Sequence, residues 1–298
     1  MPTPVIIEVA VNGVTTPDRN PHVPRTPAEI TADARRCLAA GAAIVHSHNA
    51  DFAVDGPRAA DLYEAAWRPV LAERPDALFY PTVGIGGAIE ERYAHEALLA
   101  ERGVLRIGLV DPGSVNLGGD DADGLPAPVD LVYVNTYRDI RHEVDLCARH
   151  RLGPSISIFE PGFLRVALAY HRAGRLPAGA LVKLYFGGEH GYLGGTRPGV
   201  TFGLPPTRPS LDAYLAMLEG TGLPWSVAVL GGDVFASGFA RLALERGGHL
   251  RVGLEDHAGP RQPGNEELVR EAVALARAVG RPVARCTEAA HILGLPAR

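Results

Sequence analysis

The sequence predicts an α/β fold, a single (β/α)8 TIM barrel that spans residues 1–298. Short β-branched runs alternate with longer Ala-, Leu- and Arg-rich stretches of helical period, and this pattern is typical of βα units around a parallel sheet. A length of 298 residues is usual for an α/β barrel built as one domain. The sequence shows neither a linker nor a repeat of fixed period that would divide it.

Eight short apolar runs supply the expected barrel strands. They lie at residues 5–11, 43–48, 78–83, 105–110, 155–160, 181–186, 226–231 and 250–256. A ninth run, 131–136, follows a stretch rich in Gly, Asp and Pro that has no helical period. We therefore expect it to belong to an irregular excursion after the fourth strand. Thr26 and Glu29 have capping-box spacing, which predicts the start of the first helix.

A doubly wound sheet is the competing α/β architecture. It usually carries G-x-G-x-x-G after a strand, where the glycines let a dinucleotide phosphate approach the backbone. The stretch "GIGGAI" at 84–89 follows the third strand but ends in Ile89, so the fingerprint fails.

Composition excludes several classes of protein. A net charge of −5 and a pI near 6.1 argue against a nucleic-acid partner. Three widely spaced cysteines form neither a disulfide framework nor a CxxC metal site. No apolar run approaches the roughly 20 residues of a membrane helix, and the N-terminus lacks a signal-peptide pattern. We expect a cytoplasmic protein with no membrane partner.

Two of the predicted strands end in side chains that can bind a metal or transfer a proton. In a barrel, functional groups collect at the C-terminal ends of the strands. His46 and His48 end the second strand on one face, because residues i and i+2 of a strand point the same way; Glu255 and Asp256 end the eighth. Two imidazoles and a carboxylate with open positions are typical of a catalytic divalent metal. Zn²⁺ suits this set best, and Mn²⁺ or Fe²⁺ are alternatives. Packed, hydrogen-bonded histidines are the structural alternative.

Several motifs occur in an order that resembles the β-keto acid cleavage enzyme family. They are "TPAEI", "AGAAIVHSHNAD", "TVGIGG", "GSVNLG", "GGHLRVGLEDH", "NEELV" and "GRPVA". The resemblance extends from residue 5 to about 295. It implies a zinc-dependent (β/α)8 barrel, usually tetrameric, that converts a β-keto acid and acetyl-CoA into acetoacetate and a new acyl-CoA. It also implies that this chain is a homo-oligomer.

The same resemblance implies roles for single residues. His46, His48 and Glu255 would be metal ligands, and Asp256 would be the catalytic acidic residue. The remaining candidates are Thr82, Ser114 and Asn12 for substrate binding and Glu160 as a second catalytic carboxylate.

The chemistry agrees with those roles. A β-keto acid presents a carboxylate and a ketone oxygen spaced for chelation, and a Lewis-acidic metal acidifies its C2 protons. A carboxylate not bound to the metal can take that proton, which favours Asp256 over Glu255 as the base. Hydroxyls of Thr82 and Ser114 would hydrogen-bond the substrate.

Each role has a structural alternative. Asp256 could cap the next helix, Thr82 and Ser114 could bond turn backbone, and Glu160 could orient another side chain. His249 has the inward register of Glu255, but its depth in the barrel favours core packing.

Three positions depart from the family pattern and remove expected positive charge. Where this chain has Asn49-Ala50, family members commonly carry an Ile/Val-Arg pair, and where it has Gly232 they carry an arginine. Where this chain has Val14-Thr15, just after the Asn-Gly turn of the first strand, they carry an acidic or polar residue. The segment 187–210 is long and Gly-rich, as expected of a lid or binding loop. Its arginines Arg197 and Arg208, and Arg261 in another loop, are candidates for the missing charge.

Two other functions compete. One is a metal-dependent hydrolase or aldolase, although amidohydrolase-like enzymes need histidines at the ends of strands five and six, and the runs "SISIFE" and "LVKLYF" contain none. The other is a non-catalytic barrel that binds a metal or a ligand.

Overall fold

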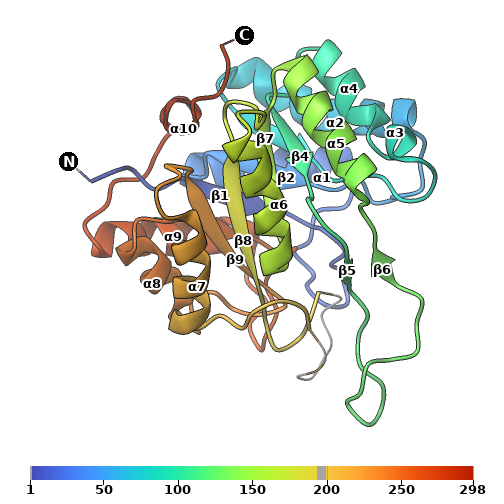
Figure 1. Cartoon of the computed structure of the whole chain (residues 1–298). Helices are drawn as coiled ribbons and strands as arrows, with labels where there is room; N and C mark the ends of the chain where they lie inside the picture. The colour runs from blue at the N-terminus through green and yellow to red at the C-terminus, as the bar shows by residue number, and fades with distance from the viewer. Residues whose placement is uncertain (1, 193–198, 200, 298) are drawn as a thin grey trace.

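Eight parallel strands form a nearly closed barrel in the computed structural model, which describes residues 2–192, 199 and 201–297 (Figure 1). The strands are β1 (Ile7–Ala10), β2 (Ile44–Ser47), β3 (Leu78–Pro81), β4 (Ile107–Val110), β7 (Gly153–Ile158), β8 (Leu181–Gly187), β9 (Trp225–Leu230) and β10 (His249–Val252). Their order in the sheet is β3-β2-β1-β10-β9-β8-β7-β4, and β3 and β4 lie in contact at its two ends. The predicted TIM-barrel fold is confirmed.

Helices cover the outside of the barrel (Figure 1). They are α1 (Pro27–Ala40), α2 (Gly56–Glu73), α3 (Ile89–Arg92), α4 (Ala94–Glu101), α5 (Tyr137–His150), α6 (Pro161–Arg172), α7 (Arg208–Leu218), α8 (Phe239–Glu245), α9 (Asn265–Ala278) and α10 (Cys286–Leu293). The capping box of Thr26 and Glu29 is present at the start of α1. The three cysteines are buried and free. No helix within the described ranges has the length and apolar character needed to span a membrane.

The expected excursion lies outside the barrel. Strand β5 (Val115–Asn116) pairs antiparallel with β6 (Val132–Tyr133), and the chain between them projects away from the barrel (Figure 1). The run at 131–136 is therefore an element of the excursion, as predicted.

The eighth barrel strand is shorter than the predicted range of 250–256. It ends at Val252 because Gly253 turns the backbone with φ +137°, and a Cβ there would lie 2.1 Å from the Ala10 carbonyl oxygen. The following turn, rather than the strand, carries Glu255 and Asp256.

Candidate metal centre and its cavity

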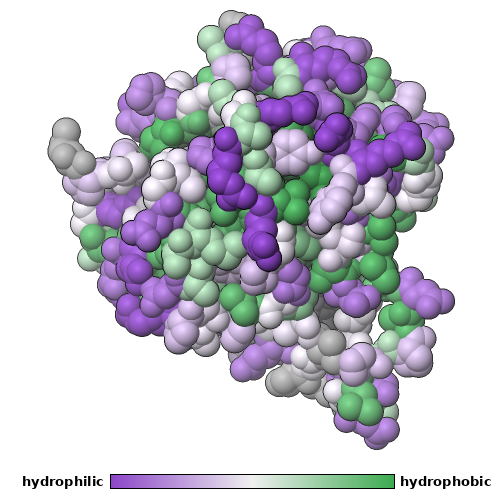
Figure 2. All heavy atoms as spheres, in the orientation of Figure 1, coloured by the Kyte–Doolittle hydropathy of each residue, from purple (hydrophilic) through white to green (hydrophobic). Residues whose placement is uncertain are grey.

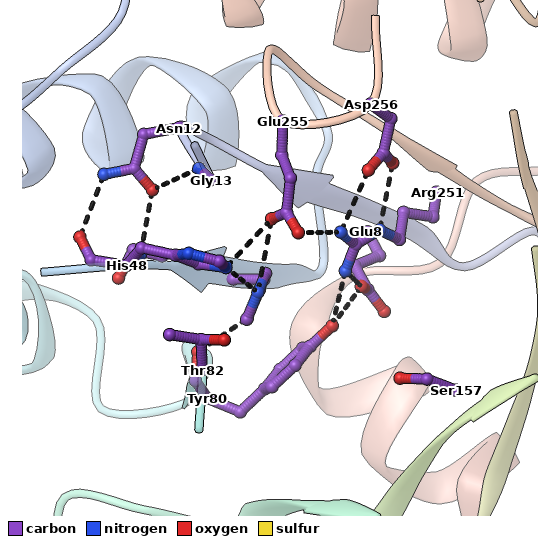
Figure 3. Close-up of polar contacts among 12 residues, drawn as sticks. Glu8, Asn12, Gly13, His48, Tyr80, Thr82, Ser157, Arg251, Glu255 and Asp256 are labelled. Atoms are coloured by element: carbon purple, nitrogen blue, oxygen red, sulfur yellow. Dashed lines mark hydrogen bonds and ion pairs between the residues drawn. The ribbon is translucent and has the colours of Figure 1, made fainter. Parts of the chain in front are cut away.

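Three buried side chains meet above the C-terminal ends of β2 and β10 (Figure 3). The Nε2 atoms of His46 and His48 lie 3.0 Å apart. Each also lies close to Glu255 Oε2, at 3.3 Å for His46 and 3.4 Å for His48. The structure thus brings together the three residues that the sequence placed at two separate strand ends.

The donor atoms fit a divalent cation. A tetrahedral zinc with bonds of about 2.0–2.1 Å holds its ligand atoms about 3.3–3.4 Å apart, close to the observed spacings. Glu255 Oε2 is buried and accepts no hydrogen bond from the described residues. Burial lowers the pKa of His46 to about 4, so its imidazole is neutral, as a metal ligand must be.

Tyr80 on β3 orients His46. The ring of His46 stacks on the ring of Tyr80 at 4.3 Å between centroids, and its Nδ1 lies 3.2 Å from the Tyr80 carbonyl oxygen. Because a carbonyl can only accept, Nδ1 carries the proton and Nε2 is left free.

Asn12 holds His48 through the backbone. Its Oδ1 accepts from the amides of Gly13 at 2.9 Å and His48 at 2.8 Å. Its Nδ2 donates to the His48 carbonyl at 2.9 Å (Figure 3) and to the Pro24 carbonyl at 3.1 Å. This side chain locks the loops after β1 and β2 together. Its polar atoms therefore contact backbone groups, and the substrate-binding role expected of Asn12 stays a prediction.

Gly13 leaves room for Glu255. Its φ is +54°, and a Cβ at this position would lie 2.2 Å from Glu255 Cγ. Only glycine accepts both constraints, which explains the Asn-Gly turn after β1.

Arg251 on β10 organises the acidic groups around the centre. It is buried and donates to both oxygens of Asp256, at 2.9 and 3.0 Å. It also lies 3.0 Å from Glu255 Oε1 and 3.0 Å from Glu8 Oε1. Burial opposes the ionisation of Glu255, but Arg251 and the imidazoles outweigh it and hold its pKa well below the ordinary value.

Asp256 lies behind this arginine. Burial raises its pKa to about 6. Both oxygens accept from Arg251. Asp256 is not among the described residues that line the cavity of about 700 Å³ beside His46, His48 and Glu255. Asp256, which the sequence analysis expected to be the base, thus contacts Arg251, and Arg251 in turn contacts Glu255.

A cavity of about 700 Å³ opens onto the metal centre. His46, His48, Glu255 and Thr82 line it, together with groups from the far side of the barrel: Asp111, Tyr133, Ser157, Lys183, Tyr185 and Tyr192. A second cavity of about 490 Å³ adjoins it and shares Phe52 and Thr82. Of the described substrate-binding candidates, only Thr82 lines the main cavity.

Ser114 and Glu160 bond backbone instead of facing this cavity. Ser114 Oγ accepts from the amide of Asn135 at 2.9 Å and donates to its carbonyl at 3.1 Å. Glu160 accepts from the amide of Gly203 at 2.8 Å and so ties down the loop after β8. Ser114 thus makes the backbone contacts of its structural alternative, whereas Glu160 contacts a loop amide and not the side chain that its alternative supposed. His249 accepts from the amide of Ile6 at 3.0 Å, in agreement with core packing.

The arginines suggested as replacements for the missing charge lie elsewhere. Arg261 pairs with Glu267 and Glu271 on the surface, and Arg208 is exposed at the start of α7. Arg197 lies outside the described residues. The cations near the centre are Arg251 and Lys183, which sequence reasoning did not select, although their inward strand positions and the scarcity of lysine were visible signals.

Comparison with known proteins agrees with this geometry. The family model "beta-keto acid cleavage enzyme" matches residues 4–295. A 3-keto-5-aminohexanoate cleavage enzyme of Acetoanaerobium sticklandii is 28% identical, covering 98% of each chain. A 3-oxoadipate:acetyl-CoA acetyltransferase of Cupriavidus necator is 27% identical, covering 99% of this chain and 96% of its own. The structure of ObcA in a ternary complex with a C4-CoA adduct and oxalate aligns with a TM-score of 0.67 and 19% identity, over 92% of this chain and 68% of that one.

Proposed function

The chain belongs to the β-keto acid cleavage enzyme family, and we propose that it converts a β-keto acid and acetyl-CoA into acetoacetate and a new acyl-CoA. The observation that supports this most is the meeting of His46, His48 and Glu255 at the mouth of a large cavity. The names of the relatives support the co-substrate. The adjoining cavity offers space for the thioester end of acetyl-CoA.

We propose Zn²⁺ as the resident metal, held by His46, His48 and Glu255, with other divalent transition metals as alternatives. When bound, it would polarise the ketone oxygen and acidify the C2 protons of the substrate. Tyr80 and Asn12 hold the two histidines, and Arg251 holds one oxygen of Glu255, so the centre is organised before a ligand arrives.

We propose Asp111 as the carboxylate that accepts the C2 proton. It lines the cavity, its Oδ2 accepts from the Tyr133 hydroxyl, and its buried Oδ1 accepts no hydrogen bond from the described residues. Burial raises its pKa, which makes it a stronger base than an ordinary aspartate. Thr82 would hydrogen-bond the substrate, and Asp256 would act through Arg251 as a positioning residue.

The assembly we propose is a homo-oligomer, a tetramer by resemblance. Six of the seven large hydrophobic side chains that are exposed in the described ranges fall between residues 125 and 137. Figure 2 shows apolar side chains over the projecting excursion. Several exposed large apolar side chains on one projecting segment are typical of a protein–protein contact.

The direct experiment is to load the protein with zinc, offer a panel of β-keto acids with acetyl-CoA, and measure acetoacetate. We expect acetoacetate and the matching acyl-CoA in equal amounts from at least one substrate. A metal-loaded protein that forms acetoacetate from none of them contradicts the proposal and favours a hydrolase, an aldolase or a binding protein.

A further inference from the structure

Lys183 is the only lysine of the chain. It lies on β8 inside the barrel, where 1% of its surface is exposed. It lines the same cavity as His46 and Glu255. The acyl transfer proposed above assigns this side chain no role.

The surroundings of Lys183 lower the pKa of its amine, which raises the neutral fraction that can act as a nucleophile. Its Nζ donates to the Tyr80 hydroxyl at 2.9 Å, and no carboxylate oxygen of the described residues lies within the 4.0 Å of an ion pair. The same hydroxyl accepts from Arg251 at 3.0 Å, so a guanidinium adjoins the amine. A buried charge without a partner is costly, and a neighbouring cation adds to the cost of protonation. Burial lowers the pKa of Lys183 to about 8 against the attraction of Glu8.

An acid–base group lies in the same cavity. Asp111 lines it, with Oδ1 free of hydrogen bonds from the described residues and Oδ2 bonded to Tyr133. Burial raises the pKa of this carboxyl. An amine with a lowered pKa and a carboxyl group that can give and take a proton are what imine formation requires.

We propose that Lys183 forms a Schiff base with the C3 ketone of a β-keto acid, so that the cavity catalyses a second reaction, decarboxylation to a methyl ketone without acetyl-CoA. This inference rests on the proposed function only in taking the same class of substrate into the same cavity.

The steps balance without a further reagent. Nζ adds to C3 while the ketone oxygen takes a proton, and the carbinolamine loses that oxygen as water, with Asp111 supplying the proton, to give an iminium ion. The C1–C2 bond then breaks, its electron pair moves into a C2–C3 double bond, and CO₂ leaves. Protonation of the enamine at C2 and addition of water release the methyl ketone and the free amine. The sum consumes one proton and produces CO₂.

A single lysine makes the test direct. Metal-free protein, prepared with a chelator, is incubated with acetoacetate and sodium cyanoborohydride. Its mass is then measured by intact-protein mass spectrometry. We expect one covalent adduct with the mass of an isopropyl group, the reduced imine of acetone, and peptide mapping places it on Lys183. Acetone release without reductant exceeds the rate in buffer.

Lys183→Met and Lys183→Arg are the matched variants, checked for folding by circular dichroism. Methionine removes the amine, while arginine keeps a positive charge but is not a nucleophile. We expect both to lose the adduct and the acetone release, and the retained N-terminal amine controls for labelling elsewhere. The proposal would be overturned if the wild type carried no adduct, or carried one only at the N-terminus. It would also be overturned if Lys183→Arg still released acetone, and Lys183 would then be a cationic anchor for a carboxylate.

The two proposals fail separately. Schiff-base trapping is measured without metal and without acetyl-CoA, whereas acyl transfer is measured as CoA-dependent acetoacetate on the zinc-loaded protein. A trapped adduct without acyl transfer supports the Schiff base on Lys183 and contradicts the proposed acyl transfer. Acyl transfer without a trapped adduct overturns only the Schiff-base proposal.

Discussion

Arg251 shows how single residues determine the site. Its guanidinium has three buried carboxylate neighbours and one buried phenol, and each of its nitrogens has a partner. A planar group with fixed donor directions can make these contacts together, whereas a lysine ammonium cannot. Arg251 thereby holds one oxygen of Glu255, and the other faces His46 and His48, where the proposed metal would bind.

Gly13→Ala tests how the metal centre is built. The added Cβ meets Glu255 Cγ, and φ is positive, so Glu255 must move away from the two imidazoles. We expect zinc affinity to fall about 10–100-fold, the range typical of groups that orient ligands, as measured by competition with a chromophoric chelator. Gly162→Ala is the control, because a Cβ there meets nothing within 4 Å. Equal affinity in both variants would contradict the account.

Asp111→Asn and Asp256→Asn separate two roles for carboxylates. If Asp111 accepts the substrate proton, Asp111→Asn lowers kcat by about 10²–10⁴-fold with zinc affinity unchanged, since general-base catalysis contributes that much. Asp256→Asn should instead weaken zinc binding, because Arg251 loses its bidentate partner. The opposite pattern would restore Asp256 as the base.

At the scale of elements, strand alternation, strand order and the turn at Gly253 account for the site. Alternation along β2 puts His46 and His48 on one face, as predicted. The convergence with Glu255 follows from the neighbouring positions of β1, β2 and β10 in the sheet. The end of β10 at Gly253 could not be predicted, because it depends on the approach of the Ala10 carbonyl from another strand.

Glu8 on β1 joins three strands through Arg251 on β10 and Tyr80 on β3. Burial raises its pKa, but Lys183 and Arg251 outweigh this, and the net pKa lies below the ordinary 4.5. A carboxyl with a lowered pKa stabilises the fold above its unfolded pKa, and this contribution is lost as the pH falls through the folded value.

Glu8→Gln should therefore destabilise the protein most near neutral pH and progressively less below about pH 4.5. Urea unfolding of both proteins across this range measures the difference. A difference that is constant or grows on acidification would contradict the ion-pair role of Glu8.

At the scale of the whole molecule, the sequence predicted the barrel, the excursion and the metal trio, since these follow from local pattern and strand order. It left two alternatives open for Ser114 and Glu160 and gave Asn12 a substrate-binding role, because a polar residue at a strand end can serve either backbone or ligand and only the folded chain shows its contacts. Lys183 was not selected as a site residue, because its place among apolar residues of a strand does not by itself show that its amine reaches the cavity. The single-domain organisation and the cytoplasmic location stay predictions.

Leu131→Asp tests the proposed assembly. Leu131 is 42% exposed, beside Val132 at 50% and Val134 at 47% in the excursion. A buried charge without a partner at a subunit contact disfavours association, so we expect a smaller species by size-exclusion chromatography with light scattering. Ala173→Asp, at the exposed end of α6, is the control. An unchanged mass in Leu131→Asp would remove the excursion from the interface.

The coordination of zinc in the loaded protein tests the central claim most directly. A crystal structure with anomalous diffraction at the zinc edge should show one ion bonded to the Nε2 atoms of His46 and His48 and to Oε2 of Glu255. An ion at any other place, or a trio that stays metal-free at saturating zinc, would contradict the account.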